Sequence, residues 1–328
     1  AAALADAGIG GDAIEHLIIG NTSAGGNPAR IIALAAGLPD TVPALSIDRQ
    51  CASGLDAILA GLRIVSAGEA DIVVAGGAEA LSTAPWRVAK PRTLQQSPRF
   101  LPIDGREDSE AGEPSYVASA EAIAEQFQIT RLAQDTYAAQ AYARAEAATM
   151  AGKFVGEITP VRTNAIEARD ESTTTPIAAD ELADMPTYRD DGGTVTAGNA
   201  ALMHDGAAFV VIVSERVRQR LGLPGLRLIA STAVGVPPNA EATSPIEAVK
   251  RLKSRLNGAS AHALDLVELA ETSAAQAIAF RDSLGVDNAV LNPDGGDVGR
   301  GRLLGNESSA ALHRAEHARE RRAGVGDE

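Results

Sequence analysis

The chain has 328 residues, enough for two domains, and 45% of them are hydrophobic while only 3% are aromatic, so its cores must be built from small aliphatic side chains. The formal net charge of -14 argues against nucleic acid and anionic membranes as partners, because both need a basic face. No apolar run approaches the roughly 18 residues of a membrane-spanning helix, and no leader precedes a cleavage site. We therefore expect a soluble, cytoplasmic protein.

The first 84 residues alternate short apolar segments with helical patterns, as α/β layers do. The elements predicted there are strands at 16–20, 42–47 and 71–75 and helices at 28–36 and 53–67. A polar, irregular stretch from 85 to 192 indicates an inserted loop domain, with helices predicted at 115–127 and 131–150. The alternation then returns. The elements predicted after residue 194 are strands at 207–213, 226–234 and 265–269, helices after 243 and at 273–284, and a charged amphipathic helix at 308–322.

A strand, a tight turn and a helix follow one another at 43–65 and again at 265–284, which suggests two similar halves. The predicted division is an N-terminal half at 1–84 plus about 193–220, a loop domain at 85–192, and a C-terminal half at 221–328.

Cys51 is the only cysteine, so it forms no internal disulfide and anchors no cysteine-rich metal site. It lies between a predicted strand and a predicted helix, where the small residues Ala52 and Gly54 allow a sharp turn. The free amides of a helix N-terminus favour a thiolate there, and a thiolate accepts acyl groups well. The alternative is that Cys51 is a small buried hydrophobic residue, as lone cysteines often are.

Several stretches of the chain resemble the motifs of the thiolase superfamily. Residues 48–55 (DRQCASGL) are similar to its nucleophile motif, 71–85 (DIVVAGGAEALSTAP) to the next strand and loop, and 193–208 (GTVTAGNAALMHDGAA) to its central motif. Further matches at 129–148, 154–161 and 265–276 occur in family order, so the resemblance covers nearly the whole chain. It implies an α/β, thiolase-like fold: two similar βαβ-rich halves in a layered α/β/α arrangement with an inserted loop domain. It also implies a homodimer, paired through the apolar run at 42–47 beside the nucleophile segment.

The resemblance also shows which catalytic groups of the family differ here. The family asparagine corresponds to Ala270, and the family histidine to Arg302. A guanidinium cannot accept a proton from a thiol, although Arg302 could stabilise a thiolate if it lay near Cys51. The family's second cysteine has no counterpart in this sequence. We therefore expect an acyltransferase that forms an acyl-thioester on Cys51 from a coenzyme A (CoA) or carrier-protein thioester, without efficient Claisen condensation or thiolysis.

Two other functions remain open. One is a non-catalytic thiolase-fold subunit or acyl-thioester-binding protein that supports an active heteromeric partner. The other is an acetyl-CoA C-acetyltransferase, that is, a 3-ketoacyl-CoA thiolase, whose missing groups come from further sequence; Arg302 argues against it, because truncation does not explain a substitution. In each case we expect a CoA or carrier thioester as ligand, no covalently bound cofactor and no metal.

The resemblance assigns further candidates to the substrate side of the site. They are Asn199, Ala201, His204, Glu241, Ala270 and Glu271. Ala201 replaces a serine that often touches the pantetheine arm, and Glu241 replaces a methionine, so its carboxylate would repel the tail of a thioester-bearing cofactor. For Asn199 and His204, packing of the loops around the site is the competing interpretation.

Overall fold

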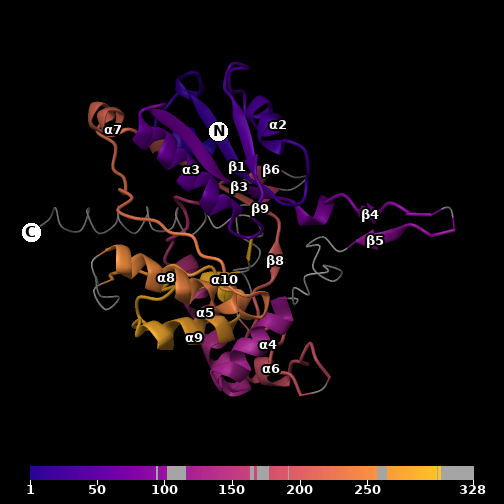
Figure 1. Ribbon diagram of the computed structural model, residues 1–328. Coiled ribbons are helices and arrows are strands. Elements are labelled where there is room, and N and C mark those ends of the chain that lie inside the picture. The colour runs from indigo at the N-terminus through magenta and orange to yellow at the C-terminus, as the bar shows by residue number, and fades with distance from the viewer. Residues whose placement is uncertain are drawn as a thin grey trace, which may run out of the picture. The chain divides into compact units, whose positions relative to one another are not determined.

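The structure is a computed structural model that describes residues 1–93, 95–101, 116–162, 166–167, 177–190, 192–256, 264–300 and 302–303. The chain forms two compact units (Figure 1). In the described ranges, unit 1 comprises Ala1–Pro85, His204–Ile229 and Leu303, and unit 2 comprises Trp86–Met203 and Ala230–Arg302.

A four-stranded mixed sheet with the order β2-β1-β3-β9 forms the centre of unit 1. Its strands are β1 (His16–Gly20), β2 (Ala44–Ile47), β3 (Ile72–Glu79) and β9 (Gly206–Val213). β1 pairs in parallel with β2 and β3, whereas β9 runs antiparallel to β3. The four strands predicted for this part of the chain are confirmed, although β2 begins later and β3 extends further than the sequence pattern indicates.

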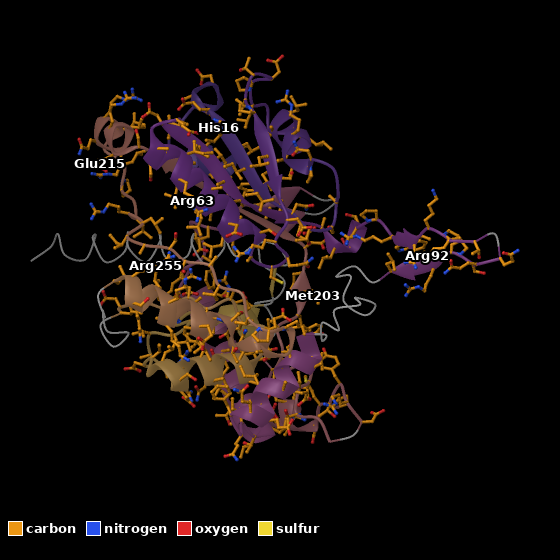
Figure 2. All side chains as sticks on the ribbon, in the orientation of Figure 1. His16, Arg63, Arg92, Met203, Glu215 and Arg255 are labelled. Carbon is orange, nitrogen blue, oxygen red and sulfur yellow. The ribbon has the colours of Figure 1, made fainter. Side chains whose placement is uncertain are left out.

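Helices cover both faces of this sheet, so unit 1 has three layers. Side chains alternate between the faces of a strand. Ile19 of β1 therefore packs in one apolar cluster with α2 (Pro28–Ala35), and its neighbour Ile18 packs in a second cluster with Ala57 of α3 (Ser53–Ala67). The other α-helices in the described part of unit 1 are α1 (Ala2–Asp6) and α7 (Glu215–Leu221), the second of which begins at the Glu215 labelled in Figure 2. Two 3-10 helices, Gly11–Ala13 and Leu81–Thr83, also belong to it. The helices predicted near 28–36 and 53–67 are confirmed.

Unit 2 is mainly helical in the described residues. Its helices are α4 (Tyr116–Gln126), α5 (Arg131–Met150), α6 (Ala179–Asp184), α8 (Ser244–Arg255), α9 (Ala274–Leu284) and α10 (Gly296–Arg300). Their apolar faces share one core, to which Ala138 of α5, Ile246 of α8 and Ile278 of α9 contribute. The helices predicted within the loop domain and after residue 243 are confirmed. None of the helices in the described ranges has both the length and the apolar character needed to cross a bilayer.

Three pairs of short strands complete the described structure. They are β4 (Arg87–Ala89) with β5 (Arg99–Leu101), β6 (Val161–Arg162) with β7 (Ile166–Glu167), and β8 (Met203–His204) with β10 (Arg302–Leu303). On the first hairpin, whose connection carries the Arg92 labelled in Figure 2, the rings of Trp86 and Phe100 meet edge to face at 5.4 Å.

Two predicted strands do not form. Residues 226–234 pair with no strand in the described part of the chain, and Leu226 and Ile229 are 56% and 69% exposed. At 265–269 the backbone makes only one parallel bridge, between Val267 and Leu291. An apolar run becomes a strand only where a neighbouring backbone supplies a ladder of hydrogen bonds, so these two predictions were wrong for the described chain. The helix predicted at 308–322 lies outside the described residues.

Candidate active site

Cys51 lies in the tight turn that connects β2 to α3, as the sequence predicts. Its side chain is partly buried and its thiol is free. The residue before it, Gln50, has a φ of 51°, in the left-handed region that residues other than glycine rarely adopt. The turn therefore holds the nucleophile candidate next to the first turn of a helix.

Hydrogen bonds within the nucleophile motif hold this turn. Ser53 Oγ accepts a hydrogen bond from Arg49 N at 2.7 Å and donates one to Gln50 O at 2.5 Å. Asp48 Oδ1 accepts a hydrogen bond from Gln50 N at 3.1 Å. The guanidinium of Arg49 pairs with the Asp56 carboxylate at 2.5 Å. Each residue from 48 to 50 is thus fixed by a partner that lies between Asp48 and Asp56.

The end of β1 lies against the start of α3. A Cβ on Gly20 would lie 2.4 Å from the carbonyl carbon of Ser53 and 2.4 Å from Gly54 N, so only glycine fits at position 20. This close packing leaves no space in which the first turn of α3 could shift. The N-terminus of α3 is therefore fixed against the edge of the sheet.

A buried carboxylate fixes the loop that follows β1. Glu79, at the end of β3, is 4% exposed and accepts hydrogen bonds from Asn21 Nδ2 at 3.1 Å, from Thr22 N and Thr22 Oγ1 at 2.8 Å each, and from Ser23 Oγ. A buried carboxylate is tolerated when donors surround it in this way. Glu79 therefore holds the loop at the same edge of the sheet as Gly20.

The chemistry available at Cys51 follows from α3. This helix has 15 residues, and Ala52 at its N-cap position makes no side-chain capping hydrogen bond. Amides of the first helical turn have no partner within the helix, and the helix dipole adds partial positive charge there. A helix N-terminus of this kind favours negative charge on a group that lies in front of it.

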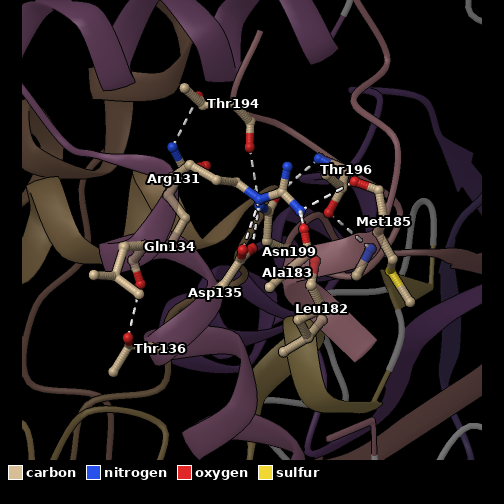
Figure 3. A network of polar contacts seen from close by, with 12 residues as sticks. Arg131, Gln134, Asp135, Thr136, Leu182, Ala183, Met185, Thr194, Thr196 and Asn199 are labelled. Atoms are coloured by element: carbon tan, nitrogen blue, oxygen red, sulfur yellow. Dashed lines mark hydrogen bonds and ion pairs between the residues drawn. The ribbon is translucent and has the colours of Figure 1, made fainter. Parts of the chain in front are cut away.

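In unit 2 the amide of Asn199 is fully engaged within the protein (Figure 3). Its Nδ2 donates to Asp135 Oδ1 at 2.9 Å and to Thr194 O at 3.0 Å, and its Oδ1 accepts from Thr196 N at 2.9 Å. Asp135 in turn pairs with Arg131 at 2.6 Å. Asn199 is 0% exposed, and its side chain holds the central motif against α5. This geometry matches the packing interpretation of the residue.

The central motif lies beside the segment that contains the family asparagine position. Ala201 N donates to Thr272 O at 3.1 Å, and Ala274 N donates to Asn199 O at 2.8 Å. The structure therefore brings Ala201 onto a segment adjoining Ala270. Ala201 is 7% exposed, and Ala270 is partly buried with a methyl group that cannot hydrogen-bond.

Glu271 is completely buried and is surrounded by donors. It accepts hydrogen bonds from the Tyr137 hydroxyl, from Asn292 Nδ2 at 2.6 Å and from Val298 N at 2.9 Å. Burial raises the pKa of Glu271 to about 7, although the three hydrogen bonds oppose the shift. Burial and the neighbouring Glu271 carboxylate raise the pKa of Tyr137 well above its usual value. The carboxylate connects α5, the 292 turn and α10 from inside the unit.

The other candidates occupy separate places. Glu241 lies in a short 3-10 helix, Pro238–Thr243, where Ser119 Oγ is 3.4 Å from its carboxylate. His204 is in β8, which pairs with the strand that carries Arg302, so the backbone of position 302 lies beside the central motif. Cys51 belongs to unit 1 and Arg302 to unit 2. Support of a Cys51 thiolate by Arg302 stays a prediction.

Sequence reasoning did not single out four residues that shape these segments. Ser53 and Glu79 lie inside recognisable motifs, so a polar side chain between apolar neighbours was an available signal for both. Tyr137 is 134 positions from Glu271 and Asn292 is 21 positions from it, and no local pattern connects them.

Comparisons with known proteins agree with this geometry. The family described as thiolase, N-terminal domain, matches residues 1–216, and thiolase, C-terminal domain, matches residues 224–325. An acetyl-CoA acetyltransferase of Thiocystis violacea is 36% identical over 93% of this chain and 81% of the relative. A beta-ketoadipyl-CoA thiolase of Pseudomonas putida is 32% identical over 95% of this chain and 83% of the relative.

Solved structures give the same result for the fold. Human mitochondrial 3-ketoacyl-CoA thiolase matches with a TM-score of 0.88 and 30% identity over 98% of this chain and 84% of that one. A thiolase from Ascaris suum in complex with coenzyme A has the same TM-score and identity over 96% of this chain and 84% of that one. The thiolase fold expected from the sequence motifs is thereby confirmed, and the chain belongs to the thiolase family of acyltransferases.

Proposed function

We propose that this protein is an acyltransferase of the acetyl-CoA acetyltransferase type, in which Cys51 carries the acyl group. The observation that supports this most directly is the position of Cys51, a free thiol in a hydrogen-bonded turn at the N-terminus of α3. Relatives named acetyl-CoA acetyltransferase match over more than nine tenths of the chain, and a related structure holds coenzyme A. The substrate in this proposal is therefore an acyl-CoA thioester.

The first half of the reaction needs only the groups around Cys51. The sulfur attacks the thioester carbonyl, a new carbon–sulfur bond forms, and the bond to CoA breaks, so that CoA leaves as a thiol with the proton that Cys51 gives up. The oxygen of the tetrahedral intermediate carries the negative charge, which free amides at a helix N-terminus stabilise. The second half passes the acyl group from Cys51 to an acceptor.

The other candidate function is an acyltransferase in which the second half of the reaction is restricted to simple acceptors, and two residues favour it. Condensation and thiolysis need a proton moved at the α-carbon, and the family residues that take part correspond here to Ala270 and Arg302. An alanine methyl orders no water, and a guanidinium accepts no proton. In this candidate Cys51 is acylated and the group passes to a simple acceptor, without efficient carbon–carbon bond chemistry. The names of the relatives favour the full acetyltransferase reaction over this restricted one.

Two measurements on the same preparation distinguish the candidates. Turnover of acetoacetyl-CoA with CoA measures thiolysis, and the intact mass after mixing with acetyl-CoA shows whether one acetyl group is added. Thiolysis that Cys51→Ala abolishes supports the full reaction. Acetylation of Cys51 without thiolysis supports the restricted one. If neither occurs and the mass is unchanged, the proposal fails, and a non-catalytic subunit that supports a partner becomes the better description.

We also propose that the chain forms an isologous homodimer through β2. This strand is at one end of the β2-β1-β3-β9 order, and Leu45 on it is 52% exposed. An edge strand with an exposed apolar residue is suited to pair with its own copy across a twofold axis. Light scattering at micromolar concentration should give the mass of a dimer, and the mass of a monomer would contradict the proposal.

A further inference from the structure

The hydroxyl of Ser53 has an unusual role for a residue in the first turn of a helix. Polar side chains at a helix start commonly cap the helix by accepting a hydrogen bond from an amide two or three residues further on. Here the bonds point the other way along the chain, to Arg49 N and Gln50 O, which precede the helix. The Ser53 hydroxyl therefore fixes the turn that carries Cys51 and does not cap α3, although the amide of Ser53 itself donates to Gln50 O at 3.1 Å.

The turn needs such a constraint because its backbone is strained. Gln50 is held at a φ of 51°, a conformation that disfavours a residue with a Cβ. The Ser53 hydroxyl bonds to the backbone on both sides of the Gln50 Cα. It accepts from Arg49 N before that atom and donates to the carbonyl oxygen of Gln50 after it. Ser53 is 0% exposed, so water cannot take the place of its hydroxyl.

Two backbone hydrogen bonds also close the turn, from Ala52 N to Arg49 O at 3.2 Å and from Ser53 N to Gln50 O at 3.1 Å. Neither of them pairs Arg49 N, whose acceptor is the Ser53 hydroxyl. The Asp48 carboxylate that accepts from Gln50 N and the Arg49–Asp56 ion pair both lie at the exposed side of the turn, where solvent competes for them. On the inner side, the close approach of Gly20 fixes the backbone of Ser53 itself. The serine hydroxyl thus connects the start of α3 to the residues before Cys51, and Cys51 lies between them in the chain.

We propose that Ser53 is a positioning residue for Cys51: its hydroxyl holds Gln50 in the left-handed conformation and thereby keeps the Cys51 sulfur at the N-terminus of α3. The proposal concerns the acyl-accepting site of the proposed function. Ser53 touches neither the acyl group nor CoA in this role. It acts through the backbone on either side of Gln50.

The test compares Ser53→Ala and Ser53→Thr with wild type, and uses Ser214→Ala as a matched control. Ser214 is a partly buried serine of unit 1 at the N-cap of α7, where its hydroxyl accepts from Val217 N at 3.4 Å and donates to the Asp71 carboxylate at 2.5 Å. Its loss should lower the melting temperature without touching the Cys51 turn. Alkylation by iodoacetamide, followed by intact mass, reports on Cys51 alone, because the chain has no other cysteine. Acetylation by acetyl-CoA is measured in parallel.

Below the melting temperature of every variant, we expect Ser53→Ala to slow both reactions by about tenfold, less than the roughly hundredfold that a 1 Å misplacement of a reacting group can cost. Ser53→Thr keeps the hydroxyl and should restore most of the rate, and Ser214→Ala should react like wild type. In urea all variants should alkylate equally. Wild-type rates in Ser53→Ala despite a lower melting temperature, or an equal loss in Ser214→Ala, would overturn the proposal. If wild type takes up no acetyl group, the proposed function fails, and the alkylation rates still decide the role of Ser53.

Discussion

The turn around Cys51 and the cluster around Glu271 hold their polar groups in different ways. In the turn, the hydrogen bonds join residues at most seven positions apart, and the thiol itself remains free and partly exposed. In the cluster, the partners of one carboxylate come from positions 134, 21 and 27 residues away, and the carboxylate is completely buried. A reactive group is left without partners, whereas a structural group is saturated with them.

This contrast predicts different costs for removing each side chain. Deleting a buried acceptor leaves its donors unpaired, and each unpaired donor costs about 1–3 kcal/mol. Deleting a partly exposed thiol leaves no donor or acceptor without a partner. The stability of the protein should therefore depend on Glu271 far more than on Cys51. The acyltransferase activity should depend directly on Cys51.

The largest expected effect is that of Glu271→Ala. It leaves the Tyr137 hydroxyl, Asn292 Nδ2 and Val298 N without their acceptor inside unit 2, so we expect a loss of about 3–5 kcal/mol in the free energy of unfolding. Cys51→Ala should cost less than about 1 kcal/mol. Urea unfolding at one pH measures both. Equal losses in the two variants would remove the distinction between the two regions.

The second prediction concerns pH. Burial raises the pKa of Glu271 from 4.5 to about 7, so between these values the folded chain holds a proton that the unfolded chain has released. The stability from this proton is fully present below about pH 4.5 and is lost as the pH rises through about 7, an effect of up to about 3 kcal/mol. Glu268 and the coupled hydroxyl of Tyr137 are the titratable neighbours that act on the same carboxyl.

Glu271→Gln tests this dependence, because glutamine does not titrate. The difference in unfolding free energy between wild type and the variant should shrink steadily from pH 5 to pH 7.5 and then become constant. Cys51→Ala serves as the control, and its difference from wild type should not change over that range. A constant difference for Glu271→Gln as well would mean that Glu271 is ionised throughout.

The same contrast explains what the sequence could predict. The four strands of unit 1 and the position of Cys51 depend on local patterns: short apolar runs, a turn of small residues and a helical period. The strands at 226–234 and 265–269 were predicted wrongly, because an apolar run indicates burial but not whether another backbone lies beside it. The Glu271 cluster depends on contacts between distant segments, and no pattern of neighbouring residues encodes them.

A smaller effect is expected at Gly296, where the 292 turn enters α10. It has a φ of +60°, and an added Cβ would lie 2.5 Å from Asn292 Nδ2 and 2.7 Å from Glu271 Oε2. Gly296→Ala should therefore cost about 2–3 kcal/mol, from backbone strain and from displaced hydrogen bonds. Gly222→Ala is the matched control, because Gly222 has a φ of +65° with no atom within 4 Å of the added Cβ. It should cost only the backbone strain, about 1 kcal/mol.

Thermal or urea unfolding of the two glycine variants separates strain from crowding. A larger loss for Gly296→Ala than for Gly222→Ala shows that the Glu271 cluster is packed too tightly to admit a methyl group. Equal losses would mean that the cluster relaxes around it, and the contrast with the open Cys51 turn would then be weaker.

The smallest expected effect is that of replacing a left-handed glutamine by glycine. Gln50 and Gln128 have φ values of 51° and 55°, and both side chains are exposed, so the two substitutions are closely matched. Glycine removes about 1 kcal/mol of strain but adds disorder to the unfolded chain, so each variant should gain no more than about 0.5 kcal/mol. Glycine adopts the left-handed conformation without this strain, so the turn around Cys51 should keep its native backbone in Gln50→Gly. Position 128 follows α4 in unit 2 and serves as the control. Alkylation of Cys51 should therefore be unchanged in both variants. A slower rate in Gln50→Gly alone would mean that the glutamine side chain itself helps to hold the turn.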